Sequence, residues 1–154
     1  RNLPMNKQIA ATNRKAYHEY HILDKFEAGI ELLGSEVKSL REGNANLKEA
    51  YVVIRKGQAW IVGVHISPYS HTGFEGPEAV RDRRLLLHKR EIDKIKLSLD
   101  QKGLTAVPLQ IYFNTKGWAK LEVGIAKGKK TYDKKASIRE RDIKRDTQRE
   151  LRNR

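Results

Sequence analysis

The side chains best suited to metal or acid–base chemistry are His18 and His21, which flank Glu19 and Tyr20. A metalloprotease motif needs two His residues four apart on one helix, with Glu next to the first. Here the spacing is three, and we predict an extended segment that turns the two rings to opposite faces. The spacing therefore argues against a metal site. Stacking or hydrogen bonding of His18 and Tyr20 with RNA bases is one interpretation, and simple packing of Tyr20 is the other.

A second stretch, Gly124–Thr131, has the composition of a phosphate-binding P-loop without its spacing. Only three residues separate its glycines where four are required, and Lys130 stands where Ser or Thr should hold magnesium. A nucleotide site is therefore not predicted. Lys127, Lys129 and Lys130 surround a glycine and remain suitable contacts for nucleic-acid phosphates.

The other reactive residue types form no catalytic pattern. The chain has no Cys, which excludes disulfides, thiol nucleophiles and Cys-based zinc sites. Ser, His and Asp show neither a nucleophile elbow nor a triad signature. Most carboxylates lie a few residues from a Lys or Arg, as Glu91 does from Lys94, which is typical of surface pairing. We predict no catalytic residue, no metal and no cofactor, and therefore no enzyme.

The last 28 residues, Lys127–Arg154, hold twelve Lys or Arg and five Asp or Glu, a net +7 of the chain's +13. Such a segment cannot bury enough apolar surface to offset its ordering entropy alone. A helix would align four arginines, spaced three or four residues apart, in one basic stripe: Arg141, Arg145, Arg149 and Arg152. We predict a tail that is disordered when free and orders on nucleic acid, and a tail that only aids solubility is the alternative.

The net charge of the whole chain restricts its partners. A charge of +13 and a pI near 10.0 indicate a polyanion, namely RNA, DNA or an anionic membrane. No run reaches the ~20 apolar residues of a membrane-spanning helix, and no lipidation signature is present, so no membrane partner is predicted. The absence of Cys fits a reducing cytosol, and we expect a cytoplasmic protein.

Hydrophobic patterning predicts an antiparallel β fold. Residues rich in alternating apolar or β-branched side chains predict strands, over Phe26–Leu32, Tyr51–Arg55, Ala59–Ile66, Leu104–Asn114 and Trp118–Ala126. The last four form two hairpins. Gly29 within the first strand suggests a bulge or a close backbone approach.

Two helices and a long loop interrupt these strands. Ser35–Glu42 is predicted to be a short helix with Ser35 as its N-cap. Leu85–Lys102 carries apolar residues three and four apart, which predicts a longer amphipathic helix. Ser67–Arg83 contains two Pro and two Gly and is predicted to be a long loop.

Together these elements predict a mainly β fold with inserted helices, a small antiparallel barrel like the oligonucleotide-binding (OB) barrels. Some barrels of this shape bind nucleic acid, although a fold alone does not establish function. We expect three parts, a flexible arm at 1–12, the barrel at 13–130 and the basic tail at 131–154. A body of this size suits a single domain, presumed monomeric.

Several long motifs fall in the order of a known family. They are Asn13–Tyr20 (NRKAYHEY), Phe26–Ile30 (FEAGI), Gly34–Arg41 (GSEVKSLR), Ile66–Tyr69 (ISPY), Arg84–Ile92 (RLLLHKREI), Val107–Leu109 (VPL) and Ala126–Lys135 (AKGKKTYDKK). Over about residues 13–145 the chain resembles the SmpB family, bacterial proteins that bind transfer-messenger RNA (tmRNA).

The resemblance implies an OB-like barrel with a basic C-terminal tail that is disordered free and helical when bound. It implies binding to the tRNA-like domain of tmRNA, supporting its alanylation by alanyl-tRNA synthetase. With elongation factor Tu and GTP, such proteins deliver tmRNA to ribosomes stalled without a codon, in trans-translation. The tail then probes the empty mRNA channel beside the decoding centre.

The resemblance also implies site residues. Those matching the family's RNA-facing surface are Asn13, His18, Tyr20, Glu27, Val37, Lys38, Leu86 and His88, with Lys127, Lys129 and Lys130 nearby. Those matching the part of the tail that reaches the decoding centre and mRNA channel are Tyr132, Asp133, Lys134, Lys135, Arg139 and Ile143.

Several of these roles have alternatives. Glu27 can accept hydrogen bonds from base donors or 2′-hydroxyls, or form a surface ion pair. Leu86 can pack on a nucleoside or sit in the core. Tyr132 can stack on a base, whereas Ile143 replaces an aromatic residue of some members, which leaves apolar insertion. The rival function is a basic structural ribosomal protein, which also combines a barrel with a tail. A barrel-fold nuclease would need a metal-binding cluster that the sequence lacks.

Overall fold

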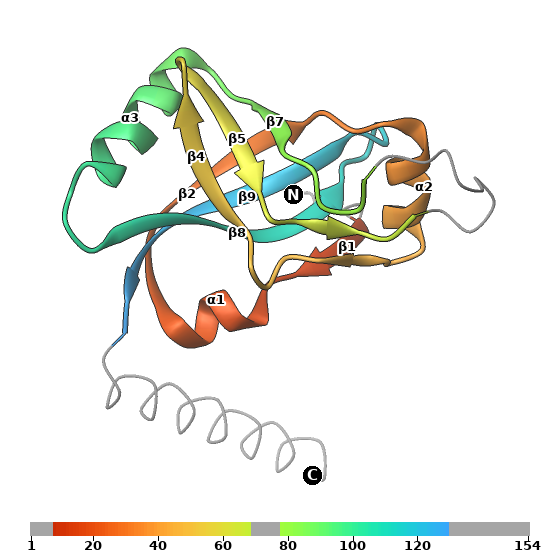
Figure 1. The fold of residues 1–154 in the computed structure, drawn as a ribbon, viewed down its shortest axis with the longest axis horizontal. Coiled ribbons are helices and arrows are strands. Elements are labelled where there is room, and N and C mark those ends of the chain that lie inside the picture. Colours follow the sequence, from red (N-terminus) through yellow and green to blue (C-terminus); the bar gives the residue numbers. More distant parts are fainter. Residues whose placement is uncertain (1–7, 69–77, 130–154) are drawn as a thin grey trace, which may run out of the picture.

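The computed structural model describes residues 8–68 and 78–129 (Figure 1). The elements, in chain order, are β1 (Gln8–Thr12), α1 (Arg14–Glu19), β2 (Tyr20–Ile30), α2 (Gly34–Arg41), β3 (Ala45–Asn46), β4 (Tyr51–Arg55), β5 (Gln58–Val62), β6 (His65–Ile66), β7 (Arg83–Leu86), α3 (Lys89–Leu99), β8 (Leu104–Phe113) and β9 (Ala119–Gly128).

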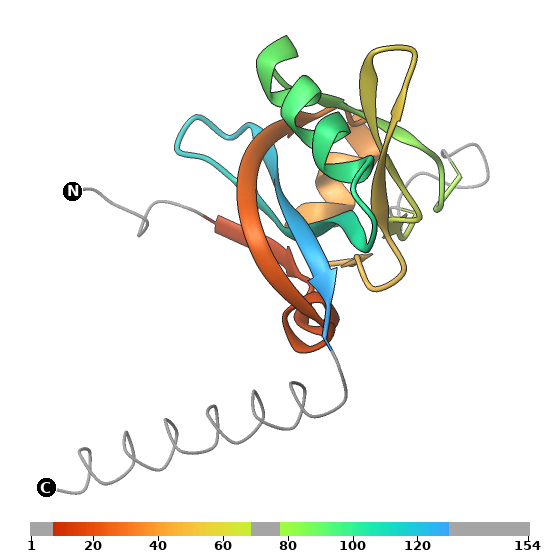
Figure 2. The same cartoon turned by 90° about the vertical axis from the view of Figure 1, so that its left-hand side faces the viewer.

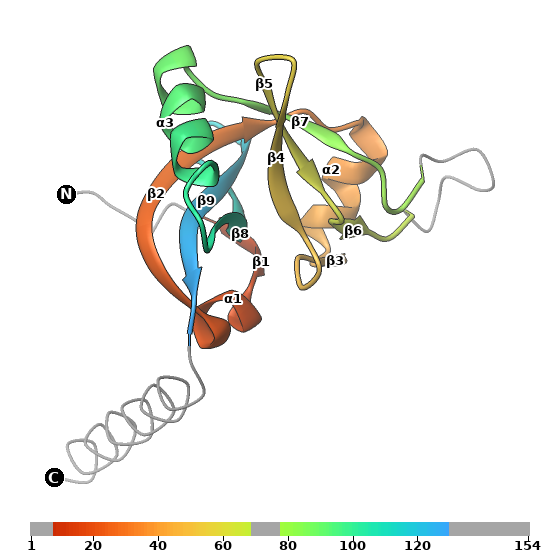
Figure 3. The ribbon, with the colours of Figure 1, turned by 60° about the vertical axis from the view of Figure 1, so that its left-hand side comes forward.

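Seven strands form one antiparallel sheet in the order β1-β8-β9-β2-β7-β5-β4, and β3 pairs separately with β6. The eleven-residue strand β2 pairs with β9 over most of its length and with β7 at its end. Because β4 at one edge lies against β8 near the other edge, the sheet curls into a barrel (Figures 1 and 3). The predicted OB-like antiparallel barrel with inserted helices is confirmed, and the described residues contain additional short strands beyond the five ranges predicted.

One face of each long strand fills the barrel interior. Phe26, Ala28 and Ile30 of β2 are buried, and Leu121 and Val123 of β9 lie beside them. Complete burial of each large aliphatic or aromatic side chain contributes ~1.5–3 kcal/mol. Over Phe26–Ile30 of β2 and the facing part of β9, burial alternates, which leaves the intervening residues there, such as Glu27 and Glu122, for the outer face of the sheet.

A buried ion-pair network around Glu36 fixes α2 to the sheet. Glu36 is 2% exposed, and its Oε1 accepts hydrogen bonds from Arg81 Nη2 at 2.6 Å and from the Leu33 backbone N–H at 2.9 Å. Its Oε2 accepts from Arg83 Nη2 at 2.6 Å, and the Arg83 side chain is wholly buried. Burial alone would raise the pKa of Glu36, but the hydrogen bonds from Arg81, Leu33 and Arg83 lower it below its usual value. The network joins α2 to the start of β7.

Both predicted hairpins are present. β4 and β5 pair around Lys56 and Gly57, whose φ angles are 50° and 74°, so both central residues have the positive φ of a type I′ turn. β8 and β9 pair along their whole lengths. The predicted close approach at Gly29 is also present, because Leu86 of β7 lies directly opposite it.

Four sequence predictions are wrong in detail. Gln8–Thr12, expected in a flexible arm, is strand β1 paired with β8, since main-chain pairing there does not need strong side-chain alternation. The helix expected from Leu85 begins at Lys89, because β7 takes up the preceding residues in the sheet. The N-cap of α2 is Leu33 rather than Ser35, since Glu36 reaches back to the Leu33 N–H.

The fourth correction concerns His18, which lies in helix α1 and not in an extended segment. Asn13 caps this helix, and the strand begins only at Tyr20. Figure 2 shows α1 beside the end of β9 and α3 at the opposite end of the barrel. The two ends therefore present separate groups of predicted site residues, joined by the long strands β2 and β9.

Candidate nucleic-acid interface

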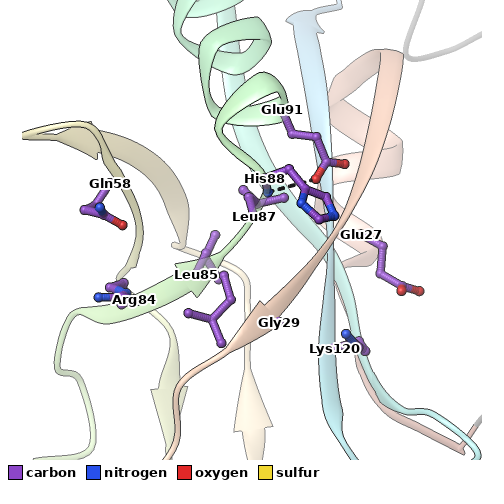
Figure 4. A pocket seen from close by; sticks show the side chains of 10 residues that line it. Glu27, Gly29, Gln58, Arg84, Leu85, Leu87, His88, Glu91 and Lys120 are labelled. Atoms are coloured by element: carbon purple, nitrogen blue, oxygen red, sulfur yellow. Dashed lines mark hydrogen bonds between the residues drawn. The ribbon is translucent and has the colours of Figure 1, made fainter.

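Three residues predicted to face RNA line one pocket on the outside of the barrel: Glu27, Leu86 and His88. They come from β2, β7 and the start of α3, and Gly29 and Lys120 line the same pocket (Figure 4). We call Glu27, Gly29, Leu86, His88 and Lys120 the β2–β7 surface. It combines a carboxylate, an imidazole, an ammonium and an apolar side chain, which together suit base edges, 2′-hydroxyls and phosphates.

The position of Leu86 follows from the alternation of β7. Arg83 and Leu85 point inward, whereas Arg84 and Leu86 point outward, and Leu86 is 46% exposed. Gly29 makes room for it, since a Cβ at Gly29 would lie only 3.2 Å from the Leu86 Cβ. Leu86 is therefore a surface residue, and the alternative that it belongs to the core is wrong.

His88 is the N-cap residue of α3. Its backbone N–H donates to Glu91 Oε1 at 3.1 Å, and its backbone is extended. The fixed backbone presents the imidazole at the point where β7 passes into the helix (Figure 4).

Glu27 is held by Tyr112. The Tyr112 hydroxyl donates to Glu27 Oε2, although β9 lies between their strands. On β9 the residue directly opposite Glu27 is Glu122, and Glu122 hydrogen-bonds with the hydroxyl of Tyr17. Burial, together with the hydrogen bond to Glu27, holds the pKa of Tyr112 far above its usual range, so the hydroxyl stays a donor at neutral pH. Two tyrosines thus support two adjacent carboxylates that would otherwise only repel.

A second pocket continues the β2–β7 surface toward α2. Gly29, Leu86 and Lys120 line both pockets, and Val37 and Trp118 line the second. We call this second pocket the Trp118 groove. Val37, predicted as a contact, therefore lies with Leu86. Lys38 is exposed on α2 next to it and lines neither pocket.

Four other predicted residues gather at the opposite end of β2, beside α1: His18, Tyr20, Lys127 and Lys129. Tyr20 pairs with Gly128, and the Lys129 Nζ donates to the Tyr17 carbonyl at 3.2 Å. Glu27 lies seven positions after Tyr20 on β2, which is roughly 20 Å along a strand. These predicted residues therefore form two groups, one near each end of the β2–β9 pair.

Asn13 lies inside the fold. It is 5% exposed, its Nδ2 donates to the Pro108 carbonyl at 2.8 Å, and its Oδ1 accepts from the Ala16 N–H at 3.2 Å. Its amide therefore fixes α1 to β8, and it does not present this amide on the outer surface as predicted. The predicted residues Lys130, Tyr132, Asp133, Lys134, Lys135, Arg139 and Ile143 lie outside the described residues.

Sequence reasoning missed Lys120, Trp118 and Arg84. The alternation of β9 could have identified Lys120, because its neighbour Leu121 points inward. Arg84 was hidden by the wrong helix boundary, and it forms an exposed ion pair with Glu31 at 3.0 Å. Trp118 was assigned to a strand, although it precedes β9 and is 67% exposed.

The described part of the chain offers little for other chemistry. Within residues 8–68 and 78–129, no group of three or more His, Asp or Glu residues is arranged to hold a metal ion. The described helices include none with the length and hydrophobicity to span a membrane.

Comparison with known proteins extends the resemblance to almost the whole chain. The family model described as SmpB protein matches residues 10–153. An SsrA-binding protein of Coprothermobacter proteolyticus is 52% identical over 145 residues, covering 93% of this chain and 96% of the relative. An SsrA-binding protein of Chlorobaculum tepidum is 53% identical over 139 residues, covering 90% of this chain and 88% of the relative.

A solved structure supports the same conclusion. It is described as "tmRNA-SmpB: a journey to the center of the bacterial ribosome", and the matching chain is 42% identical. The match has a TM-score of 0.69 and covers 84% of this chain and 94% of that chain. By sequence and by fold, this chain belongs to the SmpB family.

Proposed function

We propose that this chain binds the tRNA-like domain of tmRNA and acts in trans-translation as an RNA-binding ribosome-rescue factor. The observation that carries the proposal is the convergence of Glu27, Leu86 and His88 with Lys120 on the β2–β7 surface of an SmpB-family barrel. A relative named SsrA-binding protein and a solved tmRNA–SmpB structure support it. The protein acts by binding and positioning RNA, and it is not an enzyme.

The chemistry of the two groups of residues supports recognition of a folded RNA. On the β2–β7 surface, Glu27 accepts from base amino groups or 2′-hydroxyls, while Leu86 packs against a nucleoside. At the other end of β2, Lys127 and Lys129 contact phosphates, and His18 and Tyr20 contact bases. Because the two groups are joined by β2 and β9, one RNA arm lying along these strands can touch both.

The finer steps of the proposal come from the family resemblance and the charge of the tail. After alanylation of tmRNA by alanyl-tRNA synthetase, the protein promotes delivery of tmRNA to a stalled ribosome with elongation factor Tu and GTP, and the site of action is the cytoplasm. The tail, from Tyr132 onward, folds in the vacant mRNA channel beside the decoding centre. Folding there costs conformational entropy at the moment of binding, so the fit to an empty channel decides the outcome.

The test is a binding titration at several salt concentrations with three RNAs: the tRNA-like domain of tmRNA, an ordinary tRNA and a plain duplex of equal length. A basic protein binds all three at low salt through counterion release. We expect a preference for the tRNA-like domain that persists as the salt concentration rises. Equal and steeply salt-dependent binding to all three would contradict the proposal and favour a structural ribosomal protein, which should co-purify stoichiometrically with every ribosome.

A further inference from the structure

Trp118 is a large aromatic side chain that the fold leaves in solvent. It is 67% exposed and stands at the start of β9, just after the turn that joins β8 to β9. An exposed indole forgoes ~1.5–3 kcal/mol or more of burial relative to a core aromatic residue. The barrel core is complete without it, so stability of the fold does not account for its position.

The backbone beneath Trp118 is held in place by several hydrogen bonds. Asn114 Oδ1 accepts from the Trp118 N–H at 2.9 Å and from the Lys116 N–H at 3.0 Å. The Asn114 N–H donates to the Trp118 carbonyl at 3.0 Å. Gly117 has a φ of 80°, and its carbonyl accepts from Arg41 Nη2 at 3.4 Å. The turn therefore presents the indole from a defined backbone, which reduces the entropy lost when a ligand packs against it.

The surroundings of Trp118 combine apolar and cationic side chains. Leu86 and Val37 line the Trp118 groove with it, and Lys116 and Lys120 line the same groove. Glu31 also lines it, but this carboxylate is paired with Arg84 at 3.0 Å. An apolar floor flanked by two lysines matches a nucleotide, whose base is planar and whose phosphate is anionic.

We propose that the Trp118 groove is a base-binding subsite, in which an unpaired nucleobase of the RNA partner stacks on the indole and Lys116 or Lys120 contacts the neighbouring phosphate. This inference rests on the proposed function and deepens it. The groove shares Gly29, Leu86 and Lys120 with the β2–β7 surface. One RNA strand can therefore occupy both without leaving the protein surface.

Fluorescence tests the contact directly, because the chain has two tryptophans, Trp60 in β5 and Trp118. In a Trp60→Phe protein the emission reports on Trp118 alone. Titration with the tRNA-like domain of tmRNA should quench this emission. The quenching curve should have the same midpoint as the binding curve. The reverse variant, Trp118→Phe, leaves Trp60 as the reporter and should show little quenching. If the RNA binds and the Trp118 emission is not quenched, the subsite is overturned. The same result is expected if the indole contacts a protein partner instead of RNA.

Affinity provides the second readout. Stacking of one base on an aromatic side chain corresponds to a ~5- to 150-fold loss of affinity on substitution by Ala. We expect a loss within this range for Trp118→Ala, retention of most affinity in Trp118→Phe, and an unchanged salt slope in both. Lys120→Ala should instead reduce the salt slope by ~1, as loss of a phosphate contact does.

The two proposals fail in different ways. If the unaltered protein shows no preference for the tRNA-like domain, the proposed function fails. If it shows this preference and Trp118→Ala binds the same RNA equally well, only the subsite is overturned. A thermal melt of Trp118→Ala checks that the folded state is intact, which the exposure of Trp118 leads us to expect.

Discussion

The Tyr112 hydroxyl donates a hydrogen bond to Glu27 across the intervening strand β9, joining residues 85 positions apart in the chain. Tyr112 is buried on the outer face of the sheet, while Glu27 is exposed on the β2–β7 surface. The residue opposite Glu27 is another carboxylate, Glu122, and like charges directly opposite one another in a sheet repel. The tyrosine therefore keeps a carboxylate in a fixed orientation at a position where electrostatics alone would not hold it.

The first prediction is that Tyr112→Phe weakens binding of the tRNA-like domain about fivefold, roughly 1 kcal/mol, because Glu27 loses its orienting donor. Binding titrations of Tyr112→Phe, Glu27→Gln and the double variant form a thermodynamic cycle. If Tyr112 acts through Glu27, the tyrosine substitution should have little further effect in the Glu27→Gln protein. Fully additive losses of affinity would contradict a role of Tyr112 through Glu27. A thermal melt of each variant would distinguish a loss of RNA contacts from a loss of folded protein.

A second prediction concerns the sign of charge at position 27. Glu27→Lys should weaken binding of the tRNA-like domain although it adds positive charge, because a lysine cannot accept from base amino groups or 2′-hydroxyls. Glu122→Lys is the matched control, since it makes the same charge change directly opposite on β9. Titrations at equal ionic strength compare the two. A higher affinity of Glu27→Lys would show that the surface is only an electrostatic patch.

The strands were predictable where alternation is strong. Phe26, Ala28 and Ile30 identify the buried face of β2, and the glycine at position 57 identifies the hairpin between β4 and β5. Strand β1 was not predicted because it is stabilised by pairing with the long strand β8, and the local sequence pattern does not indicate that pairing. The helix was predicted to begin at Leu85 for a related reason. The four residues of β7, which are apolar or basic, fit a helix as well as a strand, and only their pairing in the sheet distinguishes the two.

The candidate site was predictable by residue type and not by arrangement. Glu27, Leu86 and His88 were identified from the family resemblance, but only the pairing of β2 with β7 brings them together. Tyr112 and Trp118 were missed for opposite reasons. Tyr112 has the alternation of an ordinary strand residue, and its role depends on a partner two strands away. Trp is a residue type usually found in a protein core. Only the structure of the turn at Asn114 shows that Trp118 is exposed.

A third prediction follows from the buried network around Glu36. Glu36→Gln leaves the buried Arg83 without its counter-charge, which costs ~3–5 kcal/mol of folding free energy. Thermal unfolding at neutral pH should show a fall in Tm of more than about 10 °C. Glu31→Gln is the control, because its ion pair with Arg84 is exposed and contributes less than ~1 kcal/mol. Equal melting of the two variants would contradict a stabilising role for the network.

The same network predicts a pH dependence. The pKa of Glu36 is lowered in the folded protein, so its contribution to stability is complete above the ordinary value of 4.5. It is lost as the pH falls from 4.5 through the lower pKa of the folded state, because the carboxyl group must then take up a proton. The difference in Tm between the unaltered protein and Glu36→Gln should therefore narrow below pH 4.5. A Tm difference between the two proteins that stays constant down to pH 3 would contradict a lowered pKa of Glu36.

The last prediction separates the barrel from the tail. Deletion of Lys134–Arg154 removes nine Lys or Arg and leaves the β2–β7 surface and Lys127–Lys129 in place. Binding of the tRNA-like domain should stay within a few-fold at moderate salt, with a shallower salt slope, since only non-specific phosphate contacts are lost. Peptide tagging on stalled ribosomes should be abolished, because no segment remains to fold in the empty mRNA channel. An equal loss of tmRNA binding and tagging would show that the tail is part of the RNA-binding surface, and the proposed division of labour would be wrong.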